Sequence, residues 1–141
     1  MSDKGFVDSN IILYAYSVDE KEKAEIANSL LLDHPSPLMI STQVINEITS
    51  VLLRKFQMDP SVVRNVMQEL NDVFPVVTFD IGTQQKAMDI YVRYHLQYYD
   101  ALILATAIEN GCSVLYSEDM QHEQVIENRL KIINPFYLST L

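Results

Sequence analysis

The sequence predicts an α/β protein in which helices cover both faces of a parallel sheet. Short apolar runs of strand length alternate along the chain with longer segments whose apolar residues recur every three or four positions. Strands that alternate with helices in this way pair in parallel through right-handed crossovers. In addition, acidic residues stand where several of the apolar segments end. Sites form at this carboxyl edge of parallel sheets, so the fold class also predicts where function lies.

Length and composition fit one domain. With 141 residues, of which 48% are hydrophobic, we expect a single domain over residues 1–141 with one core. The sequence has neither an apolar run of about 18 residues nor a basic, apolar leader, so we expect a cytoplasmic protein without a membrane span. The single cysteine, Cys112, cannot build a disulfide framework or a zinc site, and we expect it to be buried.

The first part of the chain predicts two strands on either side of one helix. Residues 5–8 are an apolar run that ends in an acid, and residues 38–41 are a second apolar run. Between them, apolar residues recur at helical spacing over 20–32. Pro35 and Pro37 follow, and neither can continue a helix.

The middle of the chain predicts two helices and a third strand. The helix over 43–56 is amphipathic, and Glu47 lies beside its apolar stripe. Asp59 is a suitable cap for the next helix, over 60–72, which begins with a proline. Residues 76–79 predict the third strand.

The last part of the chain predicts two more helices and two more strands. The helix over 80–95 starts at a capping aspartate, and the helix over 97–108 ends before Gly111, as a left-handed cap requires. The fourth strand lies at 113–116. After a polar stretch, the last strand lies at 130–133.

The helix over 97–108 is apolar on nearly every side but carries Asp100 in its first turn. The helix dipole would explain a single acid there. Otherwise an ionised carboxylate in apolar surroundings costs free energy unless a cation or hydrogen-bond donors meet it. Three more acids, Asp8, Glu47 and Asp119, stand where apolar segments end or turn. We therefore expect the four carboxylates to converge at one edge of the sheet.

Four clustered carboxylates favour a divalent cation. Two like charges at about 4 Å repel by roughly 4 kcal/mol at an effective dielectric near 20, and a hard divalent ion removes this conflict. Oxygen ligands suit Mg²⁺ or Mn²⁺, which support phosphodiester hydrolysis. The net charge of -9 argues against broad attraction to nucleic acid. It does not exclude a nuclease, because bound metal offsets part of the charge; a basic protein partner is the other explanation.

The segments around these acids resemble the motifs of the PIN domain, and in particular those of the VapC-type ribonuclease toxins of bacterial and archaeal toxin-antitoxin pairs. The matching segments are 6–14, 44–47, 99–107, 115–122 and the ending 133–136. The resemblance implies a three-layer αβα sandwich with a central parallel sheet of order 3-2-1-4-5. One position departs from the pattern, because the family's usual glycine is Glu123 here. The shape of that loop is therefore not predicted, and Glu123 could add a fifth acid near the metal site.

Carried over to this chain, the resemblance implies an endoribonuclease that hydrolyses single-stranded or loop RNA with Mg²⁺ or Mn²⁺. The implied catalytic residues and metal ligands are Asp8, Glu47, Asp100 and Asp119, with Ser9, Asn10 and Ser117 as supporting polar groups.

The resemblance also implies protein partners. A toxin of this kind needs a cognate antitoxin, and a basic or amphipathic antitoxin segment would suit a groove at the helices over 20–32 and 43–56. Homodimers are usual in the family. One helix face could contribute to a dimer or belong equally to the core; it comprises Val62, Val66, Met67 and Leu70.

Other functions stay open. A non-toxin PIN nuclease or an inactive PIN-fold binding module would share the same motifs. An aspartate-nucleophile phosphatase usually has a second Asp two residues after the first, but Asn10 stands there. A signalling receiver would need a second acid beside Asp8, which is missing. Tyr98 and Tyr99 suit either core packing or the stacking of RNA bases, and we expect His122 to be exposed to solvent.

Overall fold

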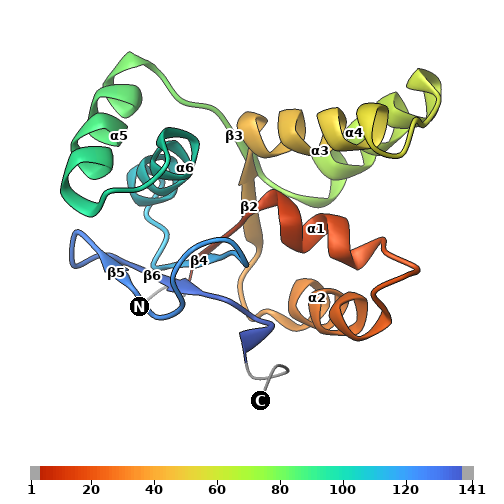
Figure 1. Ribbon diagram of the computed structural model, residues 1–141, viewed down its shortest axis with the longest axis horizontal. Helices are drawn as coiled ribbons and strands as arrows, with labels where there is room; N and C mark the ends of the chain where they lie inside the picture. Colours follow the sequence, from red (N-terminus) through yellow and green to blue (C-terminus); the bar gives the residue numbers. More distant parts are fainter. Residues whose placement is uncertain (1–3, 138–141) are drawn as a thin grey trace.

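The computed structural model describes residues 4–137, in which helices and strands alternate as the sequence predicts (Figure 1). The helices are α1 (Ser9–Ala15), α2 (Lys21–Asp33), α3 (Thr42–Arg54), α4 (Pro60–Val73), α5 (Ile81–Tyr94) and α6 (Tyr98–Glu109). The strands are β1 (Gly5–Val7), β2 (Leu38–Ser41), β3 (Val76–Val77), β4 (Val114–Tyr116), β5 (Val125–Ile126) and β6 (Leu130–Ile133). In this part of the chain, no helix is both long and apolar enough to cross a bilayer.

The strands form one sheet of order β3-β2-β1-β4-β6-β5. β1 lies between β2 and β4 and is parallel to both, and the pairs β2–β3 and β4–β6 are parallel as well. Since β6 is the fifth parallel strand along the chain, the parallel strands follow the predicted order 3-2-1-4-5. The α/β fold class with its central, mostly parallel sheet is confirmed.

The edge strand β5 is not predicted by the sequence analysis, and it pairs antiparallel with β6. The turn between them has positive φ at both Glu127 (53°) and Asn128 (56°). The backbone N–H of Arg129 closes the turn by donating to the carbonyl of Ile126 at 3.0 Å. Such turns usually contain Asn-Gly or Asp-Gly, so the glutamate conceals the usual signal.

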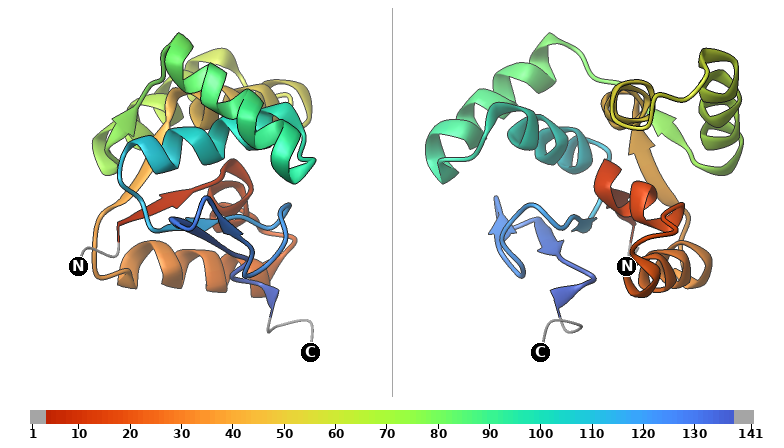
Figure 2. Two further views of the ribbon diagram at one scale, coloured as in Figure 1. Left: turned by 90° about the vertical axis from the view of Figure 1, so that its left-hand side faces the viewer. Right: turned by 45° about the vertical axis from the view of Figure 1, so that its right-hand side comes forward.

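Helices cover both faces of the sheet, which gives the predicted three layers. Figure 2 shows α2 on one side of the sheet and α5 with α6 on the other. α6 packs between α5 and the strands, and every residue from Ala101 to Ala107 is buried. This burial is expected for a helix without a polar face. Cys112 is also buried, as predicted.

The strands β1 and β3 each end earlier than predicted. β1 ends at Val7, because Asp8 caps α1 by accepting a hydrogen bond from the backbone N–H of Ser9 at 2.8 Å. The chain after Asp8 is therefore the short helix α1, which the sequence analysis does not predict. β3 stops two residues early because its neighbour β2 ends where α3 begins.

The apolar face predicted on α4 is divided between core and solvent. Leu70 is buried and Val66 packs against the core. Val62 and Met67 are instead exposed. Half of this face is therefore available to a partner.

Candidate active site

The four predicted acids approach one another from two parts of the fold. Asp8 follows β1 and Asp119 follows β4, and because these strands are parallel neighbours, both acids lie at the same edge of the sheet. We call Asp8 and Asp119 the strand pair. Glu47 lies on α3, and Asp100 lies in the first turn of α6. We call Glu47 and Asp100 the helix pair.

Electrostatic interactions join the two pairs. The pKa of Asp100 is raised to about 6, first by burial and then by the charges of Asp8 and Asp119. The pKa of Glu47 is raised by burial and by Asp8, and to a smaller extent by Asp100. Both members of the helix pair are therefore close enough to Asp8 for their charges to oppose each other.

Asp8 is the most enclosed of the four acids, with 3% of its surface exposed. Burial raises its pKa, whereas hydrogen bonds from Ser117 and Ser9 lower it. Ser117 Oγ donates to Asp8 Oδ2 at 2.7 Å, and the backbone N–H of Ser9 donates to Oδ1 at 2.8 Å. These two donors fix both carboxylate oxygens in place.

Asn10 and Ser117 position the loop that carries Asp119. Asn10 Nδ2 donates to Asp119 Oδ2 at 2.9 Å, and Asn10 Oδ1 accepts from the backbone N–H of Glu118 at 3.3 Å. Ser117 Oγ accepts from the backbone N–H of Asp119 at 3.3 Å. Ser9, Asn10 and Ser117, the predicted supporting residues, therefore each contact the strand pair.

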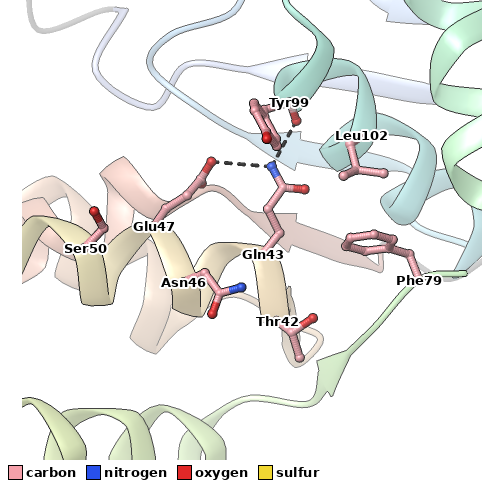
Figure 3. Close-up of a pocket in the computed structure, with 8 residues that line it drawn as sticks. All are labelled: Thr42, Gln43, Asn46, Glu47, Ser50, Phe79, Tyr99 and Leu102. Atoms are coloured by element: carbon pink, nitrogen blue, oxygen red, sulfur yellow. Dashed lines mark hydrogen bonds between the residues drawn. The ribbon is translucent and has the colours of Figure 1, made fainter.

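Gln43, which the sequence analysis does not single out, connects the two helices of the helix pair. Its side-chain Nε2 donates to Glu47 Oε2 at 3.4 Å and to the backbone carbonyl of Tyr99 at 3.0 Å (Figure 3). The first of these bonds lowers the pKa of Glu47 and so opposes the effect of burial. The spacing gave a signal, since residues four apart lie on the same helix face.

Glu118, the neighbour of Asp119, is held by other partners. It forms an ion pair with Lys23 of α2 and accepts a hydrogen bond from the hydroxyl of Tyr14 at 2.7 Å. The Lys23 ammonium also lies over the Tyr14 ring, 4.7 Å from its centroid. These contacts direct Glu118 toward α1 and α2, so Asp119 is the acid of this loop that bonds to Asn10.

Glu123 has a φ of 69°, the left-handed conformation that glycine adopts most readily. The loop is therefore built as the family's glycine would allow, although the residue is glutamate. The Glu123 side chain is 65% exposed, and its Oε1 lies 3.5 Å from His122 Nε2. His122 stacks on Tyr137 and accepts the backbone N–H of Asn134 at Nδ1. The expectation that His122 is exposed is wrong, since this ring is largely enclosed and structural.

The donor set suits a hard divalent cation, although its atoms are not assembled in advance. All four side chains offer carboxylate oxygens, and a cation between them would remove the repulsion described above. Among the described residues, no three Asp, Glu, His or Cys side chains are arranged to hold a metal ion. The carboxylates would have to close on the ion as it binds. Their role as metal ligands stays a prediction.

A pocket of about 340 Å³ opens beside the helix pair (Figure 3). Its lining includes Thr42, Gln43, Asn46, Glu47, Phe79 and Tyr99. Because Glu47 belongs to both, the pocket and the acidic cluster adjoin.

The fold and the cluster define a class of protein: an αβα domain with acids at the carboxyl edge of its parallel strands, where such folds bind ligands. The chain belongs to the PIN domain family, whose characteristic sequence matches residues 5–128. No curated protein is similar enough in sequence to count as a relative.

Solved structures of toxin-antitoxin proteins share this fold at low sequence identity. A toxin-antitoxin complex from Klebsiella pneumoniae matches with a TM-score of 0.68 and 19% identity, over 94% of this chain and 98% of that one. VapC20 of Mycobacterium tuberculosis, a toxin that cleaves the sarcin-ricin loop, matches with a TM-score of 0.63 and 19% identity. The match covers 79% of this chain and 87% of VapC20. VapBC2 from Rickettsia felis, bound to a DNA fragment from its promoter, matches with a TM-score of 0.65 and 15% identity. The match covers 92% of this chain and 98% of the matched chain. At these identities the likeness shows a common fold.

Proposed function

We propose that this chain is an endoribonuclease that depends on Mg²⁺ or Mn²⁺, with one nuclease domain over residues 1–141. The observation that carries the proposal is the electrostatic repulsion among four carboxylates, those of Asp8, Glu47, Asp100 and Asp119. Burial, together with this repulsion, raises the pKa of Asp100 to about 6. Four ionised carboxylates that repel one another favour a bound cation, and such a site suits metal-assisted hydrolysis of a phosphodiester. Membership of the PIN domain family supports this reading of the cluster.

In the proposed site the four carboxylates would hold the metal, and neighbouring donors hold three of these carboxylates. A bound divalent ion would offset phosphate charge and lower the pKa of a water molecule. The hydrogen bonds to Asp8, Asp119 and Glu47 hold these side chains in place. Among the described residues no donor bonds to Asp100, which must lose its proton before it can bind a cation.

We further infer that the chain acts in the cytoplasm as the toxin of a toxin-antitoxin pair. Similar structures include complexes of this kind, and a net charge of -9 favours an antitoxin segment that is basic or amphipathic. Exposed apolar side chains on the predicted groove helices, Leu32 of α2 and Leu53 of α3, offer it apolar contacts. We also infer a homodimer, for which Val62 and Met67 of α4 are available.

Cleavage of single-stranded RNA by the purified protein tests the nuclease proposal. We expect hydrolysis with Mg²⁺ or Mn²⁺ and none with Ca²⁺ or in excess EDTA. The variant Asp8→Asn should be inactive. The matched control Asp59→Asn alters an exposed acid that caps α4, and it should keep full activity. Robust hydrolysis in excess EDTA would contradict the mechanism.

Expression in a bacterial host tests the toxin assignment. Growth arrest by the wild type, but not by Asp8→Asn, is the expected outcome. Co-expression of the neighbouring small gene should relieve the arrest and yield a stable complex. Hydrolysis without arrest would favour a non-toxin PIN nuclease, and no hydrolysis of any RNA would favour an inactive PIN-fold binding module.

A further inference from the structure

The pocket beside the helix pair has the composition of a site for an uncharged group. It lies between the first turns of α3, the start of α6 and Phe79, which precedes α5 (Figure 3). Among the described residues that line it, Glu47 is the only charged one; the others are amides, hydroxyls, aromatic rings and a leucine. A phosphate would find no cationic side chain there. A flat apolar group with a polar edge fits this lining.

The carbonyl oxygen of Gln43 is an unused acceptor at this pocket. Gln43 is 7% exposed, and within the described part of the chain its Oε1 has no hydrogen-bond partner. The orientation of the amide is determined, because both partners of Nε2, on Glu47 and Tyr99, are acceptors. Figure 3 shows Oε1 directed toward Leu102 and Phe79, which both line the pocket. Because this oxygen is buried, a ligand N–H would reach it only by parting Leu102 and Phe79, and it would then supply the missing bond.

Tyr99 gives the pocket an accessible aromatic ring. Its surface is 60% exposed, and its ring meets the ring of Tyr98 edge-on with centroids 5.6 Å apart. Tyr98 instead packs against the core, whereas Tyr99 leaves its ring accessible to a stacking partner. Unpaired bases of RNA stack on rings of this kind and are read at their edges by side-chain amides. Asn46 offers such an amide in the same lining.

We propose that this pocket binds one unpaired nucleobase of the substrate, adjacent to the phosphate that the acids hold. Tyr99 stacks on the face of the base, and Asn46 with Gln43 Oε1 meets its polar edge. Two positions support this arrangement, since Glu47 lines both sites and Tyr99 directly precedes Asp100. The inference rests on the proposed function for the phosphate, whereas the pocket itself can be tested without any cleavage.

Binding of free nucleosides tests the pocket independently of activity. We would titrate ¹⁵N-labelled protein in EDTA with adenosine, cytidine, guanosine and uridine, and with ribose as the ligand that lacks a base. The side-chain amide signals of Gln43 and Asn46 and the backbone signals of α6 should shift with at least one nucleoside and not with ribose. Equal shifts with ribose, or no shifts with any nucleoside, would overturn the inference.

Paired tyrosine variants test the stacking. Tyr99→Ala should weaken nucleoside binding about tenfold, within the range of base–aromatic stacking. Tyr91→Ala removes a similarly exposed tyrosine from α5, outside this pocket, and should leave binding unchanged. Equal affinity in the wild type and Tyr99→Ala would overturn the stacking role.

Cleavage of a randomised single-stranded RNA pool separates this inference from the proposed function. The wild type should show a base preference at one position next to the cut. Tyr99→Ala and Asn46→Ala should flatten that preference and raise KM more than they lower kcat, while Tyr91→Ala keeps it. Hydrolysis with an unchanged preference in both pocket variants would reject the base pocket and leave the nuclease. Nucleoside binding without any hydrolysis would reject the nuclease and leave the pocket.

Discussion

The strand pair and the helix pair carry the same functional group in different surroundings. Asp8 accepts two short hydrogen bonds and Asp119 accepts one, all from residues at the carboxyl edge of the sheet. Glu47 accepts a longer bond of 3.4 Å from Gln43, and a hydrogen bond with the Ser9 side chain also lowers its pKa. Among the described residues Asp100 accepts none. The strand pair is therefore held by short hydrogen bonds, whereas in the helix pair Glu47 has a weaker bond from Gln43 and Asp100 has no donor among the described residues.

This difference assigns different tasks to the two pairs. Donors that bond a carboxylate fix the positions of its oxygens, so the strand pair is oriented before a cation arrives, although burial still raises the pKa of Asp8. The pKa of Asp100, raised to about 6, means that its charge is costly until a cation offsets it. Asp100 is thus the residue of the site whose charge should respond most clearly to metal, because the described residues offer it no donor.

The largest effect is expected when either pair loses a charge. Asp8→Asn and Asp100→Asn should each reduce RNA cleavage to below about one thousandth, because both change a carboxylate proposed to bind metal. In EDTA, Asp100→Asn should melt at a higher temperature than the wild type, since repulsion within the cluster falls. Thermal melts with EDTA and with Mn²⁺ measure this. Equal metal-induced shifts in the wild type and Asp100→Asn would contradict the proposed role of Asp100.

The next effect concerns the donors of the strand pair. Ser117→Ala should lower the free energy of unfolding by about 1–3 kcal/mol, because Asp8 loses a buried donor. Ser29→Ala is a matched control, since it removes a serine hydrogen bond to Asp33 on the surface of α2. Its effect should stay within about 0.5 kcal/mol. Urea unfolding measures the free energy of unfolding of both variants. Equal losses of stability would show that the burial of Asp8 does not make its hydrogen bond from Ser117 more stabilising than one on the surface.

Much of the fold could be predicted from the sequence because each element has a local signal. Apolar runs located the five parallel strands, and the apolar character of α6 predicted its burial. The β5 hairpin could not be predicted, because Glu127 takes a left-handed conformation only under the constraint of pairing with β6. Residues that are unusual for their backbone conformation are recognised only when the tertiary structure is known.

The acids of the site could be located from the sequence, but their surroundings could not. An acid after a strand predicts its edge of the sheet, which places Asp8 and Asp119. The role of Gln43 depends on the approach of α3 to Tyr99, which lies 56 positions away. Which of the two adjacent acids joins the site, Glu118 or Asp119, likewise depends on contacts with distant helices. Such contacts between distant segments leave no periodic signal in the sequence.

A smaller effect is expected from pH, and its sign follows from Asp100. Its pKa is about 6 in the folded protein, above the value of 3.8 for a free side chain. Between these values the folded state binds more protons than the unfolded state, so the contribution of Asp100 to stability falls as pH rises through this window. In EDTA the melting temperature should fall by about 3 °C more in the wild type than in Asp100→Asn between about pH 4 and 7, a shift limited by solvent screening.

Metal should reverse this trend. A cation binds only the deprotonated carboxylate, so stabilisation by Mn²⁺ should grow as pH rises through about 6 in the wild type. Parallel melting curves for the wild type and Asp100→Asn at every pH, with and without Mn²⁺, would show that Asp100 does not titrate in this range.

The smallest change in stability is expected at Gln43, where function should change more than folding. Gln43→Met keeps the length of the side chain and removes its bonds to Glu47 and to the Tyr99 carbonyl. The same change removes a buried oxygen that has no partner among the described residues, and leaving such an oxygen unpaired costs about 1–3 kcal/mol. Loss and gain should nearly cancel, so the free energy of unfolding in EDTA should change by less than about 1 kcal/mol.

Glu47 should nevertheless lose its orientation in Gln43→Met. The Mn²⁺ concentration that gives half of the maximal thermal stabilisation should therefore rise several-fold, and base binding does not contribute to this measurement because no RNA is present. Ser117→Ala should lose more stability in EDTA than Gln43→Met, because the Ser117 hydroxyl bonds a more deeply buried carboxylate, that of Asp8. A loss of stability in Gln43→Met as large as in Ser117→Ala would mean that hydrogen bonds hold the helix pair as firmly as the strand pair. The difference between the two pairs would then lie only in burial and charge.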